Sequence, residues 1–183
     1  MIRVAEIVNF LEMLAPPTLA EEWEVTLAVA LRTRELLERE GAQVFLVRDS
    51  DEPVGLGARV RRAERSGAHI LVSVHANALP DGVNPFVNSG TSVYYYQPRS
   101  ARLALELNRA LVGQFGARDL GFGRADLAMA RPTWMPAALT EGLFMMVPDQ
   151  EAVLLSDDGQ LKYARGIVNG LKAFLKYRRD LSD

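Results

Sequence analysis

The segment that most constrains the fold is residues 69–78, with the sequence HILVSVHANA. Its apolar, β-branched centre is typical of a buried strand. The strand is expected to end at His75, because Pro80, Asp81 and Gly82 then indicate a loop. Ligands of open α/β sheets bind at the carboxyl ends of strands. His75 is therefore a candidate metal ligand or proton carrier, with a hydrogen-bonded structural histidine as the ordinary alternative.

The remaining chain alternates between strand-like and helix-like patterns. A capping box of Thr18 and Glu21 predicts the start of the first long helix, and residues 1–14 fit either a helix or a strand. Helices are expected at 18–40, 56–66, 100–115 and 158–177, and strands at 42–49, 69–75, 91–97, 126–130 and 137–144. This alternation predicts an α/β fold, a single domain over residues 1–183 with a twisted, mostly parallel sheet and helices on both faces.

Composition narrows the classes of function. The net charge of −2, with acids and bases mixed along the chain, argues against binding to nucleic acid. The absence of cysteine excludes disulfides, thiolate metal sites and cysteine nucleophiles. No run of residues is long and apolar enough to predict a membrane span, and the first residues lack the features of a secretory signal. Either the protein stays inside the cell, or a signal was removed or lies outside this chain.

Few residues offer catalytic chemistry. Ser73 points the same way as His75 but lacks a nucleophile elbow, and GFGRAD at 121–126 is interpreted as a turn rather than a phosphate loop. Metal chemistry fits better, because a catalytic zinc takes three His, Asp or Glu ligands and a nearby carboxylate moves protons. Glu141 follows the apolar strand 137–140, and Glu22 falls in the first turn of the long helix. Helix-dipole stabilisation alone would also explain Glu22.

With these residues in place, the chain resembles the zinc-dependent N-acetylmuramoyl-L-alanine amidases of the amidase 3 family. The resemblance runs from about residue 21 to 175 and follows four segments in order: EEWEVTLAVALRTRELLEREGAQVFLVRD, LGARVRRAERSGAHILVSVHANA, GTSVYYY and RADLAMARPTWMPAALTEGLF. It implies that Glu22 and His75 are zinc ligands and that Glu141 is the catalytic glutamate. It also implies that Asn77 and Arg131 lie near the substrate.

One family feature is absent from the sequence before Glu22. The family begins with a strand that ends in an Asp-Pro-Gly-His-Gly-Gly type segment, whose histidine is the first zinc ligand, and residues 1–17 are atypical in lacking it. His69 cannot replace it, because six strand residues place it roughly 20 Å from His75. Three explanations stay open: the first strand is missing from this chain, a residue such as Glu6, Asn9 or Glu12 substitutes, or zinc and activity have been lost.

The resemblance therefore implies a peptidoglycan amidase. It would cleave the amide between the lactyl group of N-acetylmuramic acid and L-alanine, with zinc as cofactor and Glu141 as general base. It would work in the periplasm or outside the cell. A degenerate, non-catalytic peptidoglycan-binding or regulatory module is the main alternative, and a generic metallo-exopeptidase is a weaker one. The oligomeric state is not predicted.

Overall fold

The fold is built on a six-stranded sheet with the order β2-β1-β3-β6-β4-β5. The computed structural model describes residues 1–8, 22–50, 52–78 and 83–181, and for residues 6–8 it describes the backbone alone. The strands are β1 (Arg3–Val8), β2 (Gln43–Leu46), β3 (Ile70–Asn77), β4 (Thr91–Tyr95), β5 (Asp119–Arg124) and β6 (Ala137–Phe144). Neighbouring strands pair in parallel except β4 and β6, which are antiparallel. The predicted mostly parallel sheet is confirmed.

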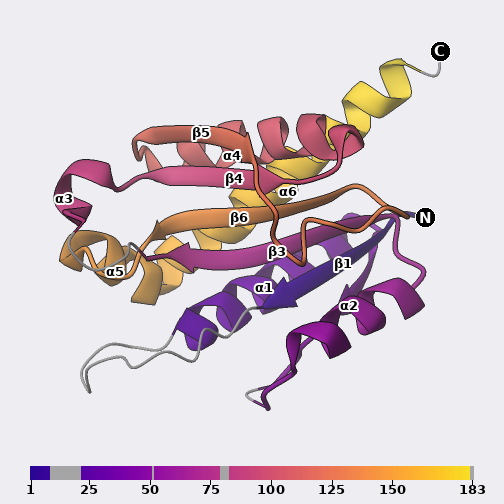
Figure 1. Ribbon diagram of the computed structural model, residues 1–183, viewed down its shortest axis with the longest axis horizontal. Helices are drawn as coiled ribbons and strands as arrows, with labels where there is room; N and C mark the ends of the chain where they lie inside the picture. Colours follow the sequence, from indigo (N-terminus) through magenta and orange to yellow (C-terminus); the bar gives the residue numbers. More distant parts are fainter. Residues whose placement is uncertain (9–21, 51, 79–82, 182–183) are drawn as a thin grey trace.

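Helices connect the strands and cover the sheet (Figure 1). They are α1 (Glu22–Arg39), α2 (Leu56–Arg65), α3 (Pro85–Asn88), α4 (Ala101–Phe115), α5 (Pro148–Leu155) and α6 (Asp157–Asp180), with a short 3-10 turn, η1 (Pro98–Ser100), before α4. The expected four long helices are therefore present. The short helices α3 and α5 were not predicted, and the Thr18–Glu21 capping box lies outside the described residues.

Apolar residues pack on both faces of the sheet. Buried side chains of α1, α4 and α6 form the larger core against Val72, Val74 and Ala138. The smaller core on the opposite face joins Ala63 of α2 and Met135 to Leu71. Alternate residues of β3 thus enter opposite cores, as the period of two in a strand requires. A strand buried on both faces explains the near-continuous apolar run that dominates this part of the sequence.

β1 occupies a central position in the sheet, between β2 and β3. Its last residue, Val8, pairs with Val74 of β3. The explanation that the first strand is missing is therefore wrong, because this chain supplies that strand itself. Glu6 pairs with Val72, three residues before His75, so its backbone lies about 10 Å from the level of His75. Asn9 and Glu12 lie outside the described residues.

Two predictions between residues 116 and 130 are wrong. The turn expected at 121–126 is largely strand, because β5 pairs with β4 and the Asp119 carboxylate accepts the Gly121 N–H at 2.7 Å. The strand expected at 126–130 is a turn, in which Ala130 donates its N–H to the Leu127 carbonyl at 2.9 Å. Met129 and Ala130 are buried all the same, so core packing rather than strand pairing explains the apolar pattern of this segment.

Candidate functional site

The candidate site lies where the parallel strands β1, β3 and β6 end and helix α1 begins. Figure 1 shows these strand ends on the side of the molecule that also carries α3 and α5. β3 contributes His75 and Asn77, β6 contributes Glu141, and Glu22 is the first residue of α1. Ligands are expected at this edge of an α/β sheet. Three of the predicted residues, Glu22, His75 and Glu141, thus come together from separate parts of the chain.

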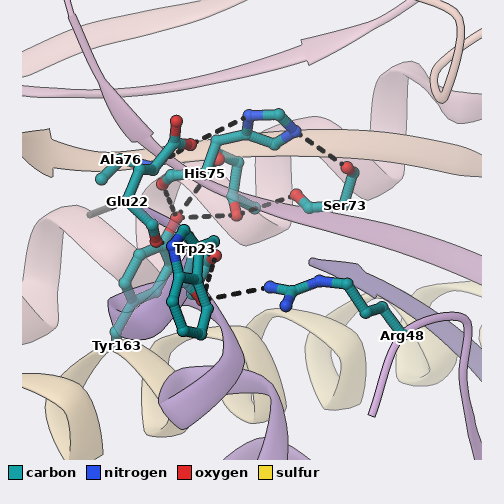
Figure 2. A network of polar contacts seen from close by, with 9 residues as sticks. Glu22, Trp23, Arg48, Ser73, His75, Ala76 and Tyr163 are labelled. Atoms are coloured by element: carbon teal, nitrogen blue, oxygen red, sulfur yellow. Dashed lines mark hydrogen bonds and ion pairs between the residues drawn. The ribbon is translucent and has the colours of Figure 1, made fainter. Parts of the chain in front are cut away.

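Glu22 and His75 contact each other directly, as Figure 2 shows. Glu22 Oε1 lies 3.3 Å from His75 Nδ1, and the two side chains are only 14% and 8% exposed. The same carboxylate oxygen accepts the N–H of Ala76 at 3.1 Å. The start of α1 is thereby fastened to the end of β3, and a charge in the first turn also agrees with the helix dipole.

The second ring nitrogen of His75 is also engaged. Nε2 lies 3.1 Å from the Ser73 hydroxyl, two residues earlier on the same face of β3. The expectation that Ser73 points the same way as His75 is confirmed. Because both nitrogens have a partner, the imidazole ring is held in one orientation, as a ligand or proton carrier requires.

Helix α6 supports the site from below through Tyr163. Its hydroxyl donates to the carbonyl of His75 at 2.7 Å and lies 2.9 Å from the Thr140 hydroxyl (Figure 2). Burial raises the pKa of Tyr163, so the phenol stays protonated and keeps donating. A Cβ on Gly142 would lie 2.3 Å from the Tyr163 ring. Glycine after Glu141 therefore lets the ring pack directly beneath the site.

The strand expected at 137–144 is confirmed, and Glu141 lies inside it rather than at its end after the apolar stretch 137–140. Its strand does not end there but continues to Phe144, and Glu141 pairs with His75 on one side and Ser92 of β4 on the other. The pairing with β3 becomes irregular just beyond this level, between His75 and Asn77. The carboxylate therefore sits inside the sheet, at the same level as the histidine, rather than in a loop.

The carboxylate of Glu141 is the electrostatically unusual group of the site. Burial, and secondarily the charge of Glu22, raises the pKa of Glu141 well above the ordinary glutamate value. Its Oε2 atom is buried with no hydrogen-bond partner among the described residues, and the same is true of the Ser92 hydroxyl opposite. Buried polar atoms normally have partners. A carboxyl group whose pKa is raised in this way keeps its proton to higher pH than an ordinary glutamate does, as a group that exchanges protons with a substrate requires.

A buried arginine adds positive charge near Glu22. Arg59 of α2 is 4% exposed, and its Nε donates to the Val54 carbonyl at 2.6 Å. Burial lowers the pKa of Arg59, whereas the negative charge of Glu22 acts to raise it. The Arg59 guanidinium is thus a positively charged neighbour of Glu22.

The remaining predicted residues are less clearly part of the cluster. Asn77 is the last residue of β3, and its backbone carbonyl accepts the N–H of Met145 at 3.2 Å. Arg131 forms an ion pair with Asp126, and its carbonyl accepts from Gln97 at 3.0 Å. Arg131 lies on the segment after β5, and neither of these contacts connects it to Glu22 or His75.

Glu22 and His75 are the residues of this site that could bind zinc. A catalytic zinc takes three protein ligands and keeps one position open. Glu22 and His75 supply two suitable donors, but no group of three His, Cys, Asp or Glu residues that could hold a metal occurs in the described part of the chain. These residues by themselves do not fit a catalytic zinc site.

Sequence reasoning missed Tyr163, Gly142, Ser92 and Arg59. Tyr163 lies on the buried side of α6, where an aromatic residue with a polar tip signals a buried hydrogen bond. Arg59 lies on the buried side of α2 together with Ala63, where a charged residue is unusual. The pairing of Ser92 with Glu141 depends on strand order, which no local pattern reveals.

The geometry defines a class of protein: an α/β domain with a His–Glu pair and a second, half-buried glutamate at the carboxyl ends of its strands. Comparison with known sequences identifies the family. The profile of the family described as N-acetylmuramoyl-L-alanine amidase, the amidase 3 family, matches residues 15–173. The chain belongs to this family, as the sequence resemblance predicted.

Curated relatives and solved structures agree with this assignment. An endolysin of Bacillus phage SPP1 is 31% identical over 168 residues, which cover 87% of this chain and 60% of that protein. The amidase LytC of Bacillus subtilis is 31% identical over 159 residues, which cover 85% of this chain but 31% of LytC. The chain therefore spans less than two thirds of the length of both.

Among solved structures, the catalytic domain of CwlV from Bacillus (Paenibacillus) polymyxa superposes with a TM-score of 0.85 at 27% identity, over 96% of this chain and 99% of that domain. AmiC2 of Nostoc punctiforme gives a TM-score of 0.86 at 28% identity, over 96% of this chain and 97% of that one. Both of these proteins are N-acetylmuramoyl-L-alanine amidases. The fold is thus that of the amidase domain.

Proposed function

We propose that this chain is a peptidoglycan amidase that hydrolyses the amide between the lactyl group of N-acetylmuramic acid and L-alanine of the stem peptide. Family membership supports the reaction class. The observation that carries the proposal is the pairing of His75 on β3 with Glu141 on β6, together with the contact between Glu22 and His75. We propose the cell wall as the place of action, outside the cytoplasmic membrane. The described residues include no helix long and apolar enough to cross a membrane.

Glu141 is the proposed general acid–base group. Its carboxylate would take a proton from the attacking water, so that the new C–O bond forms at the lactyl carbonyl. The C–N bond then breaks, and the same carboxyl group returns the proton to the leaving amine of L-alanine. The raised pKa of Glu141 favours this return, because its protonated form persists to higher pH than that of an ordinary glutamate.

Glu22 and His75 are the proposed pair that faces the reacting carbonyl. The resemblance assigns them to zinc, and a family zinc ion would polarise the carbonyl. The described residues supply two such ligands, Glu22 and His75, rather than the three that a catalytic zinc takes. Asn77 and Arg131 remain proposed substrate contacts on the strength of the resemblance alone.

A second candidate function is a non-catalytic peptidoglycan-binding or regulatory module. The direct contact of Glu22 with His75 at 3.3 Å favours it, because the two side chains already interact with each other. The two candidates differ in their products. Purified peptidoglycan incubated with the amidase would gain free L-alanine amino groups, whereas the binding module would be retained on peptidoglycan without releasing any.

Metal analysis adds an independent observation. The protein would be incubated with zinc, desalted and assayed for bound metal, with the His75→Ala variant as the control. About one zinc per chain, lost in the variant, would support a zinc site that includes His75. Metal at the level of the variant, together with no amide cleavage, would favour the binding module.

A further inference from the structure

A cavity lies at the opposite end of the parallel strands from the candidate site. It has a volume of about 510 Å³ and is lined by residues that precede the parallel strands, by the turn η1 and by the end of α6: Ile2, His69, Ile70, Arg99, Trp134, Pro136, Phe174, Leu175, Arg178 and Arg179. His69 immediately precedes β3 and His75 lies near its end, roughly 20 Å away. Figure 1 shows this edge at the N-terminus, next to the last turns of α6.

The charge of this cavity is one-sided. Among the residues that the structure describes, its lining contains three arginines and a histidine but no aspartate or glutamate, although the whole chain has a net charge of −2. Two other cavities are balanced: one pairs Arg3 with Glu38, and another combines Arg32 and Arg34 with glutamates of α1. Concentrated positive charge in a hollow raises the local concentration of anions.

Two of the arginines, Arg99 and Arg179, are exposed to solvent at this cavity. Arg99 is exposed at the start of η1, and Arg179 is exposed near the end of α6. The contact of Arg179 with Asp180 is 3.8 Å long and exposed on both sides, so it competes weakly with a bound anion. Guanidinium groups bind carboxylate and phosphate through two parallel hydrogen bonds.

The rest of the lining is mostly apolar. Ile70 and Phe174 are buried in the floor of the cavity, whereas Trp134 remains 43% exposed at its side. An exposed indole beside arginines suits a ligand that has both an apolar face and a negative group. The apolar face of a sugar ring packs well against such an indole.

We propose that this cavity binds a glycan strand that carries carboxylate groups, in particular the strand that amide cleavage leaves behind. This inference rests on the proposed function, because hydrolysis of the lactyl amide leaves one free lactyl carboxylate on each cleaved muramic acid. The site would hold the cleaved part of a strand about 20 Å from the candidate catalytic residues. Arg99 and Arg179 bind the carboxylate, and Trp134 packs against the sugar.

The test measures binding rather than catalysis, so it gives a result whether or not the chain is an amidase. The probe is a purified glycan strand whose stem peptides have been removed to leave free lactyl groups. Its affinity is measured by calorimetry for the full chain and for a variant that combines Arg99→Gln with Arg179→Gln. The Arg34→Gln variant, changed in a balanced cavity, is the matched control.

The expected result is a loss of affinity of about ten-fold or more for the double variant and of several-fold for Trp134→Ala, with less than a two-fold change for the control. Binding should also weaken as salt is added. Equal affinity for an uncharged N-acetylglucosamine oligomer would overturn the proposal, as would equal losses in the control. Tighter binding of poly(glycerol phosphate) than of the glycan would assign the cavity to a phosphate polymer instead.

Discussion

Glu22 Oε1 lies 3.3 Å from His75 Nδ1 and accepts the Ala76 N–H at 3.1 Å, so one carboxylate oxygen joins the first turn of α1 to the end of β3. The two residues are 53 positions apart in the sequence. The same contact therefore holds α1 against β3 and positions two residues of the proposed active site.

This contact should appear as a measurable energetic coupling. We expect Glu22→Gln and His75→Gln each to lower the free energy of unfolding, and the double variant to lose less than the sum of both. Neighbouring buried residues typically couple by roughly 0.5–3 kcal/mol. Urea unfolding of the four proteins measures the cycle. Strict additivity would show that the two side chains do not interact in solution.

The hydroxyl of Tyr163 should contribute to the stability of the fold, separately from the packing of its ring. The Tyr163→Phe variant keeps the ring but leaves the buried His75 carbonyl without its donor at 2.7 Å. We expect a loss of about 1–3 kcal/mol in the free energy of unfolding. Tyr177→Phe is the control, because the Tyr177 ring contacts Arg102 through its face, which phenylalanine retains. Equal effects of the two changes would contradict this role.

Gly142 should tolerate no side chain. In Gly142→Ala the new methyl group would overlap the Tyr163 ring at 2.3 Å, and we expect a loss of about 1–3 kcal/mol or more with a displaced ring. Gly113→Ala is the matched control, since a Cβ there meets nothing within 4 Å inside helix α4. That change should be neutral or stabilise the helix by up to about 1 kcal/mol. Thermal unfolding of both variants distinguishes them, and a harmless Gly142→Ala would be incompatible with the packing described.

Glu141 should make the protein less stable as pH rises. Because burial raises the pKa of Glu141 in the folded state, the folded protein binds this proton more tightly than the unfolded chain. The contribution is most favourable below the ordinary glutamate pKa and is lost as pH rises from there through the raised value. The Glu141→Gln variant should therefore be more stable than the wild type at neutral pH, with a flatter pH dependence. Urea midpoints between about pH 4 and 8 measure the difference. An unchanged pH profile would contradict the raised pKa.

Much of the fold could be predicted from local patterns. The β-branched run before His75 and the apolar stripes of the long helices indicate structure within a single segment, and these elements are confirmed. β5 was missed because glycines at 121 and 123 suggest a turn, whereas the strand is held by pairing with β4 and by the Asp119 side chain. An edge strand of this kind depends on a distant partner.

The candidate site was predictable in its members but not in its arrangement. Glu22, His75 and Glu141 could be found from strand ends, helix starts and family resemblance. That Glu141 lies within β6 between His75 and Ser92 follows from the strand order, and Tyr163 beneath them follows from the packing of α6. Both are long-range properties that single segments do not encode.

The most direct test of the proposed amidase is the release of L-alanine amino groups from purified peptidoglycan by the wild-type chain and by Glu141→Gln. We predict release by the wild type, with a rise in rate as pH passes through the raised pKa of Glu141. We predict a loss of about 10²-fold or more in the variant, because general acid–base catalysis contributes that much. Equal release by both proteins, or no release by the folded wild type, would contradict the proposed amidase.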